Sequence, residues 1–272
     1  MAKNENMLST VTPWDMVAQG YAETSMMMLQ AYTERAINLL KIDPTSKILD
    51  VACGPGTLSL EISKKVDSVY AIDFSPEMLT IFKNKLNEHG IINVDVCCGD
   101  GQDLPYEDER FDAAFSMFGL MFFPERNKGF SELYRTVKPG GQIAVSSWAP
   151  VGKSPAMQIM FGAIRAMKPE IPEPQTDIAS LENPEVFHKE MQAVGFKNID
   201  VHLVSIDFPV ESVEKFWSNM VNGSAPIVMM KNSMSPEEWS EKEKIALAYL
   251  HENVTSVPTS LSSDAWIACA EK

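Results

Sequence analysis

The chain has 272 residues, of which 45% are hydrophobic and 22% are charged, and these proportions are ordinary for a soluble globular protein of one large domain, or of one domain with a smaller appended unit. Its net charge of −14 argues against binding to nucleic acid or to an anionic membrane surface, because both depend on clustered Lys and Arg. The four cysteines lack the spacing of a zinc site, so free thiols and no metal are predicted. No apolar stretch is long enough to span a bilayer, and the first residues do not resemble a secretory signal, so the sequence predicts a cytoplasmic protein without integral membrane association.

Residues 12–40 are predicted to form one or two helices that end near Asp43 and Pro44. The segment contains apolar residues at helical spacing and no pattern typical of a strand. Residues 1–44 are therefore expected to lie outside any sheet.

From residue 47 to residue 148, short apolar runs alternate with amphipathic segments of helix length. Strands separated by helices of this length are typical of βαβ units, in which helices cover both faces of a parallel sheet. The sequence therefore predicts a doubly wound α/β fold. The predicted strands are residues 47–52, 68–74, 92–98, 111–119 and 142–148; Ser75 and Pro76 are typical of a helix start, Gly90 of a helix end, and residues 138–141 (KPGG) of a turn.

The last part of the chain predicts two further strands separated by helices. Helices are expected around residues 154–168 and 184–194, and a strand at residues 197–210. Residues 211–252 are again helical in pattern, and residues 265–272 are expected to form a closing strand. This arrangement predicts a helical lid, inserted at about residues 211–256, over one edge of the sheet.

The stretch DVACGPGTLS (residues 50–59) predicts a ligand-binding loop between the first strand of the sheet and its helix. Gly54 and Gly56 can adopt positive φ angles and leave backbone N–H groups open to a ligand. Asp73 ends the second strand, where a carboxylate can accept hydrogen bonds from both hydroxyls of a ribose. Together these residues predict a nucleoside site at the carboxyl ends of the strands.

Two ligand classes share a glycine loop and a ribose acid. A dinucleotide loop has the pattern G-x-G-x-x-G, whereas the third glycine is here replaced by Ser59. Asp50 precedes the loop, and a fixed carboxylate would repel a pyrophosphate. A ligand that carries positive charge fits better, and S-adenosylmethionine has both an ammonium and a sulfonium group.

Four ordered segments resemble the class I S-adenosylmethionine-dependent methyltransferases, and in particular the small-molecule C-methyltransferases of ubiquinone and menaquinone biosynthesis. They are ILDVACGPGTLSL, VYAIDFSPEML, CCGDGQDLPYEDERFDAAFSMFGL and RTVKPGGQIAVSSW. The resemblance covers roughly residues 45–150 and implies a Rossmann-like methyltransferase fold with a mostly parallel, seven-stranded sheet. It divides the chain into an N-terminal helical lid segment (1–44), an S-adenosylmethionine-binding core (45–150), and the rest of the sheet with its lid insertion (151–272).

The resemblance also implies roles for individual residues. The segment from Asp50 to Gly56 is expected to hold the methionine moiety and Asp73 the ribose, while Asp100 is expected to accept a hydrogen bond from the adenine amine. Aromatic residues of the N-terminal helix are expected to fold over the cofactor. The predicted cofactor-binding residues are Trp14, Tyr21, Asp50, Ala52, Gly54, Gly56, Asp73, Phe74, Met78, Asp100, Gly101, Gln102 and Met117.

The acceptor is predicted to be a small, partly apolar or aromatic molecule. The segment FGLMFFPE (residues 118–125) follows the fourth strand and is expected to face the transferred methyl group, with Phe118, Met121, Phe122 and Phe123 as candidate pocket residues. The N-terminal helices and residues 211–252 are expected to close over one cavity, with residues 226–230 nearer the acceptor. Methyl transfer would be an in-line displacement, which needs little more than positioning and exclusion of water.

The sequence assigns no catalytic residue. Only His251, in the lid, is a candidate base. A nicotinamide-dependent oxidoreductase is an alternative, and the chain contains one Tyr-x-x-x-Lys pair, Tyr134 and Lys138, which is interpreted as a chance match. A non-catalytic S-adenosylmethionine-binding protein is a second alternative. The sequence does not predict the oligomeric state.

Overall fold

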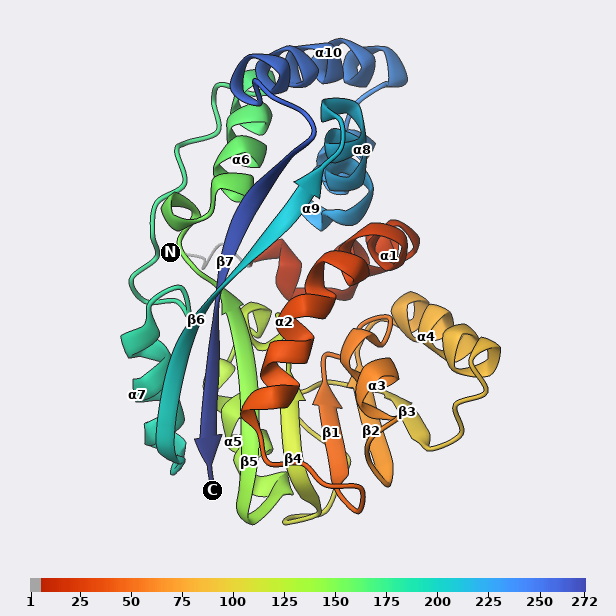
Figure 1. Ribbon diagram of the computed structural model, residues 1–272, viewed down its shortest axis with the longest axis vertical. Helices are drawn as coiled ribbons and strands as arrows, with labels where there is room; N and C mark the ends of the chain where they lie inside the picture. Colours follow the sequence, from red (N-terminus) through yellow and green to blue (C-terminus); the bar gives the residue numbers. More distant parts are fainter. Residues whose placement is uncertain (1–5) are drawn as a thin grey trace.

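The structure is a computed structural model that describes residues 6–272 of the chain (Figure 1). The N-terminal part consists of η1 (Met7–Ser9), α1 (Val11–Gly20), a π-helical turn η2 (Tyr21–Ser25) and α2 (Met26–Leu39). The central part consists of β1 (Lys47–Val51), α3 (Thr57–Ile62), β2 (Ser68–Asp73), α4 (Pro76–Glu88), β3 (Val94–Cys98), β4 (Phe111–Ser116), η3 (Leu120–Phe122), α5 (Arg126–Thr136) and β5 (Val137–Trp148). The last part consists of η4 (Val151–Lys153), α6 (Pro155–Met167), α7 (Pro184–Val194), β6 (Lys197–Val210), α8 (Val213–Gly223), α9 (Ala225–Asn232), α10 (Pro236–Asn253) and β7 (Thr259–Glu271).

Within the described residues, one sheet of seven strands runs in the order β3-β2-β1-β4-β5-β7-β6. The strands from β1 to β5 pair in parallel, and β7 is antiparallel to both β5 and β6. The predicted doubly wound, mostly parallel fold is therefore confirmed. From β1 the chain adds β2 and β3 on one side and then β4 and β5 on the other, so the order in which strands are added reverses between β1 and β4. Doubly wound sheets bind ligands at the carboxyl ends of the strands on either side of such a point.

Helices cover both faces of the sheet, with α2 and α3 on one face and α5 and α7 on the other (Figure 1). Neighbouring residues of β1 point to opposite faces and both are fully buried: Ile48 packs in the cluster of Tyr32 and Leu58, and Leu49 packs in the cluster of Phe130. A strand covered on both sides needs an apolar residue at nearly every position. This is why the central strands could be predicted from continuous apolar runs.

Two strands begin earlier than predicted. β5 starts at Val137, so the KPGG stretch that was expected to form a turn belongs to the strand; Gly140 has a φ of +76° there, and the pairing with β4 shifts register between Phe111 and Ala113. β7 starts at Thr259, before the predicted apolar run, because it pairs with β6 up to the pair of Val210 and Thr259. The Ser-rich start of β7 carries no apolar signal, and only the partner strand makes it a strand.

The helices inserted between β6 and β7 form a helical unit with α6 at one end of the molecule, where β6 and β7 extend past the other strands (Figure 1). Their shared apolar cluster includes Trp217 of α8 and Trp239 of α10, whose rings stack with centroids 6.4 Å apart. α8 and α9 also pack on α1 and η2. At that contact Ser25 Oγ donates a hydrogen bond of 3.0 Å to the carbonyl of Gly223, and a Cβ atom on Gly20 would overlap the carbonyl of Asn222.

In the part of the chain that the structure describes, none of the helices is both long enough and apolar enough to cross a membrane. The division of the chain at residues 44/45 and 150/151 stays a prediction.

Candidate cofactor and acceptor site

A cavity of about 270 Å³ lies at the carboxyl ends of β1, β2 and β4. Three parts of the chain line it: the N-terminal segment from Leu8 to Thr33, the loops that follow β1, β2 and β3, and residues 117–124 after β4. All of the predicted cofactor-binding residues line the cavity except Asp50 and Gly56. The residues that do are Trp14, Tyr21, Ala52, Gly54, Asp73, Phe74, Met78, Asp100, Gly101, Gln102 and Met117.

The glycine loop approaches the cavity through Gly54 and supports the fold through Gly56. Gly54 has a φ of +53°, and a Cβ atom placed on it would have no protein atom within 4 Å, so this position is open towards the cavity. Gly56 has a φ of +91°, and a Cβ atom there would overlap the ring of Phe82 on α4. The first glycine therefore leaves space for a ligand, and the second permits close packing of α3 against α4.

Asp50 lies behind the loop and not in the cavity. Its side chain is 1% exposed, and Oδ2 accepts a hydrogen bond of 2.6 Å from the hydroxyl of Ser59. Burial, together with the nearby Asp73, raises the pKa of Asp50 to about 7. Ser59 stands where a dinucleotide loop would have its third glycine, and its hydroxyl is instead used to bind this carboxyl group.

Asp73 presents a carboxylate whose oxygens are each half occupied. Oδ2 accepts a hydrogen bond of 2.8 Å from the backbone N–H of Gly54, and Oδ1 accepts one of 2.9 Å from the N–H of Ser75. A carboxylate oxygen can accept two hydrogen bonds, so each oxygen keeps one position for a ligand hydroxyl. Burial raises the pKa of Asp73 to about 6, and the backbone N–H groups of Ser75, Gly54 and Phe74 act in the opposite direction.

Asp100 and Gln102 border the cavity on the loop after β3. Asp100 Oδ1 accepts hydrogen bonds from the backbone N–H and the side-chain amide of Gln102, at 2.9 and 3.1 Å. The amide oxygen of Gln102 accepts a bond of 2.9 Å from the N–H of Glu125. A Cβ atom on the neighbouring Gly101 would lie 2.5 Å from Phe123, so the loop after β3 and the segment after β4 are closely packed.

The N-terminal segment covers the cavity, and its first lining residues, Leu8 and Ser9, are called the strap below. Ser9 Oγ donates a hydrogen bond of 2.7 Å to the carbonyl of Phe122, and Trp14 Nε1 donates one of 2.9 Å to the carbonyl of Leu8. The rings of Trp14 and Phe122 lie 5.2 Å apart. The bond to Phe122 ties this segment to the core beside the cavity.

A second contact joins the N-terminal segment, through α1, to the part of the cavity next to Asp73. The hydroxyl of Ser75, which caps the N-terminus of α4, donates a hydrogen bond of 2.6 Å to Asp15 on α1. Met78 of α4 packs against Val17 and Ala18 of α1. Because Ser75 is two residues after Asp73, α1 is docked directly beside the predicted ribose site.

Tyr21 lies near Asp73 and is half-buried. Burial, and secondarily the charge of Asp73, raise the pKa of the Tyr21 hydroxyl, so this group stays a proton donor at neutral pH. Its ring meets the edge of Trp14 at a centroid distance of 6.4 Å. The two predicted aromatic residues are therefore brought together over the cavity.

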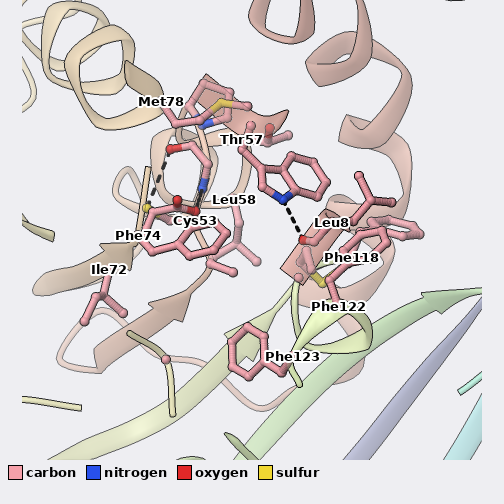
Figure 2. A pocket seen from close by; sticks show the side chains of 18 of the residues that line it. Leu8, Cys53, Thr57, Leu58, Ile72, Phe74, Met78, Phe118, Phe122 and Phe123 are labelled. Carbon is pink, nitrogen blue, oxygen red and sulfur yellow. Dashed lines mark hydrogen bonds between the residues drawn. The ribbon is translucent and has the colours of Figure 1, made fainter. Parts of the chain in front are cut away.

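Apolar side chains lie on two sides of the cavity. Figure 2 shows Phe74, Met78 and Ile72 towards one side and Leu8, Phe118 and Phe122 towards the other. Of the four acceptor-pocket candidates, Phe118, Phe122 and Phe123 line the cavity. The fourth, Met121, packs against the apolar clusters on both faces of the sheet.

Some lining residues were not predicted. Leu29 and Thr33 reach the cavity from α2, and Leu58 reaches it from α3. Leu29 and Thr33 are four residues apart, so they project from the same face of the helix. This spacing was visible in the sequence, but it did not indicate which face of α2 would meet the loop after β1.

The remaining candidates lie elsewhere. His251 Nε2 is 2.9 Å from Glu214 on an exposed surface, and Lys138 binds Asp112 at 2.6 Å, while Tyr134 packs on Phe196. Neither the histidine nor the Tyr-x-x-x-Lys pair lines the cavity. Among the described residues, no part of 211–256 lines it either; this insertion contacts α1 and η2, and Ala225 and Val228 of α9 pack in one apolar cluster with Trp14 and Tyr21, which do line the cavity.

Comparison with known proteins agrees with this arrangement. A methyltransferase domain family matches residues 48–141. The chain is 30% identical over 188 residues to the ubiquinone/menaquinone biosynthesis C-methyltransferase UbiE of Geotalea daltonii, which corresponds to 61% of this chain and 77% of that protein.

Two solved structures show the same fold. The YcgJ protein of Bacillus subtilis superposes with a TM-score of 0.58 at 17% identity, over 88% of this chain and 97% of that one. A phosphoethanolamine N-methyltransferase of Haemonchus contortus, solved with S-adenosylhomocysteine, superposes with a TM-score of 0.55 at 15% identity, over 89% of this chain and 52% of that one.

These likenesses confirm the resemblance seen in the sequence. The chain belongs to the class I S-adenosylmethionine-dependent methyltransferases. The cofactor of this family is S-adenosylmethionine.

Proposed function

We propose that this protein transfers the methyl group of S-adenosylmethionine to a small acceptor that carries no negative charge and is partly apolar or aromatic. The observation that carries the proposal is one cavity in which Asp73, with two free acceptor positions, faces the same space as a cluster of aromatic side chains. The first feature fits a ribose, and the second fits an apolar molecule beside it.

The residues of the cavity fit the parts of the cofactor. Asp73 would accept hydrogen bonds from the two ribose hydroxyls, and Phe74 and Met78 would pack on the adenosine. Asp100 would accept a hydrogen bond from the adenine amine, although Gln102 already occupies part of its carboxylate. Gly54, with open space on its Cα, would let the methionine moiety lie against the loop.

S-adenosylmethionine supplies an activated methyl group that an acceptor atom attacks in line with the departing sulfur. The protein then has to position the acceptor and exclude water. Trp14, Tyr21 and Phe122, together with the strap from Leu8 to Ser9, would do this by covering the cavity. We assign no general base, because none of the described histidines lines the cavity.

The charges around the cavity favour an acceptor without negative charge. Its charged lining residues, among those described, are Asp73 and Asp100, and they include no Lys, Arg or His. An acceptor carboxylate or phosphate would add a negative charge to that of the cofactor's own carboxylate, would lose its hydration, and would find no cationic side chain in this lining. Acceptors with a hydroxyl, an amine or a reactive ring carbon remain.

Two alternatives, a nicotinamide-dependent oxidoreductase and a non-catalytic S-adenosylmethionine-binding protein, are tested by ligand binding and by product release. The loop does not favour a nicotinamide dinucleotide, because Ser59 replaces the third glycine and binds Asp50. S-adenosylmethionine and S-adenosylhomocysteine should therefore raise the melting temperature, and NADH and NADPH should not. A shift with a nicotinamide nucleotide alone would contradict the assignment.

The acceptor is found by following release of S-adenosylhomocysteine with a panel of small molecules arranged in matched pairs. Each pair should share one ring system and differ in a hydroxyl or a carboxylate. We expect turnover with members of the hydroxyl series and none with their carboxylates. A protein that binds the cofactor but releases no product with any acceptor would support the non-catalytic alternative.

A further inference from the structure

The hydroxyl group of Thr33 has no hydrogen-bond partner among the described residues, although it is buried. Thr33 is 1% exposed, and its Oγ1 lies within the protein beside the cavity. In α-helices a threonine hydroxyl often bonds the carbonyl of the preceding turn, but no such bond is formed here. A buried hydroxyl without a partner is unfavourable, so an unpaired one beside a ligand cavity calls for a partner in the ligand.

Thr33 borders the part of the cavity next to the glycine loop. It follows Leu29 by one helical turn on α2, and it shares the lining with Leu58, the second residue of α3, just after the loop. Leu29, Leu58 and Phe118 belong to one apolar cluster. A Cβ atom on Gly119 would overlap Ala52, so the segment after β4 closes this end against the loop.

The charges of the lining limit how a ligand carboxylate can be bound there. S-adenosylmethionine and S-adenosylhomocysteine both end in an amino acid whose α-carboxylate needs hydrogen-bond donors. The described lining contains no Lys, Arg or His. Neutral donors must therefore bind this carboxylate, and a buried hydroxyl with an unused proton is one of them.

We propose that Thr33 is a cofactor-binding residue, and that its hydroxyl donates a hydrogen bond to the α-carboxylate of the cofactor's amino-acid tail. The inference rests on the proposed function, because it assumes that the cavity holds this cofactor. It assigns to α2 a recognition role that the motifs of residues 45–150 do not contain. It also predicts that the protein distinguishes the complete cofactor from nucleosides that lack the tail.

The test uses Thr33→Val and Thr33→Ser. Valine has the shape of threonine and the same branching at Cβ, so it removes the hydroxyl with little change to the helix or to packing. Serine keeps the hydroxyl and serves as the matched control. Binding of S-adenosylhomocysteine and of 5′-methylthioadenosine, which has the same thioether nucleoside without the amino acid, is measured by calorimetry on all three proteins.

We expect Thr33→Val to weaken S-adenosylhomocysteine about tenfold, which corresponds to about 1.4 kcal/mol, and to leave 5′-methylthioadenosine within about twofold. Thr33→Ser should bind both ligands nearly as the wild type does. The ligand-free Val variant should melt at or above the temperature of the wild type, because it no longer buries an unpaired hydroxyl. A purely structural role would lower that melting temperature instead.

Three results would overturn the inference. Equal weakening of both ligands would mean that Thr33 acts on the nucleoside or on the shape of the pocket. Unchanged binding of S-adenosylhomocysteine to the Val variant would mean that the hydroxyl does not reach the tail, while the proposed function would stand. Failure of the wild type itself to bind S-adenosylhomocysteine would defeat the proposed function and this inference together.

Discussion

Replacement of Asp73 by alanine tests the proposed cofactor site most directly. The carboxylate accepts hydrogen bonds from the N–H groups of Gly54 and Ser75, and it keeps one free position on each oxygen for a ribose hydroxyl. The variant removes both positions. It leaves the apolar residues Phe74 and Met78, which also line the cavity, unchanged.

The size of the effect follows from what each group loses. A hydrogen bond to a charged acceptor contributes about 1.5–3 kcal/mol, and water will compensate part of the loss of two, so we expect affinity for S-adenosylhomocysteine to fall about ten- to a hundredfold. The fold should persist. The two backbone N–H groups each lose about 1 kcal/mol, but removal of a buried carboxylate whose pKa is raised to about 6 relieves a desolvation cost.

Calorimetric titration of wild type and Asp73→Ala with S-adenosylhomocysteine measures this effect. Asp103→Ala is the control, because it removes the same charge from an exposed residue of the loop after β3 that does not line the cavity. Wild-type affinity should also decrease as the pH falls through about 6, where Asp73 becomes protonated, and the Ala variant should not show this dependence. Unchanged affinity in a folded Asp73→Ala protein would refute the site.

Three further changes test the loop, the strap and the buried acid. Gly56→Ala should lower the free energy of unfolding by about 1–3 kcal/mol in chemical denaturation, because φ is +91° and the new Cβ would overlap Phe82; an unchanged midpoint would contradict the packing role. Asp15→Ala removes the acceptor of the hydrogen bond from Ser75, so it should speed amide hydrogen exchange in residues 14–30. Bound cofactor should slow exchange in the same residues. Exchange that responds to neither change would show that the N-terminal helices do not close over the cavity. Asp50 has a pKa raised by burial from 3.8 to about 7, so the folded protein binds a proton that the unfolded chain releases, and wild-type stability should fall as the pH rises from about 4 to 7. Asp50→Asn should reduce that fall, and an identical pH profile in denaturant titrations would show that the group does not titrate in this way.

The local sequence determined the parallel core and the position of the ligand site. Gly54 and Asp73 could be assigned because each lies at the carboxyl end of a strand, and the carboxyl ends of neighbouring parallel strands meet at one edge. Phe118 and Phe122 could be assigned for the same reason, since they follow β4. Each of these residues lies only a few positions from the end of a strand. The strand therefore places the residue at the ligand edge, and the tertiary structure adds only the register between strands.

The tertiary structure decided which groups face the ligand and which support them. Asp50 and Gly56 belong to the same motif as Gly54, but Asp50 bonds Ser59 behind the loop and Gly56 makes room for Phe82. The insertion at residues 211–256 was expected to border the cavity, and instead it packs on α1 and η2, which lie between it and the cavity only through side chains such as Trp14 and Tyr21.

The contribution of Leu8, Ser9 and Thr33 was not visible in the sequence, although their segment was expected to cover the site. Their contacts join residues far apart in the chain, such as Ser9 and Phe122, which are separated by 113 positions. Helical periodicity shows that α2 has an apolar face, but an amphipathic face can pack against any apolar surface of the right shape. The side chains that meet across such an interface are selected by packing of the whole molecule, and the local pattern carries no information about the partner.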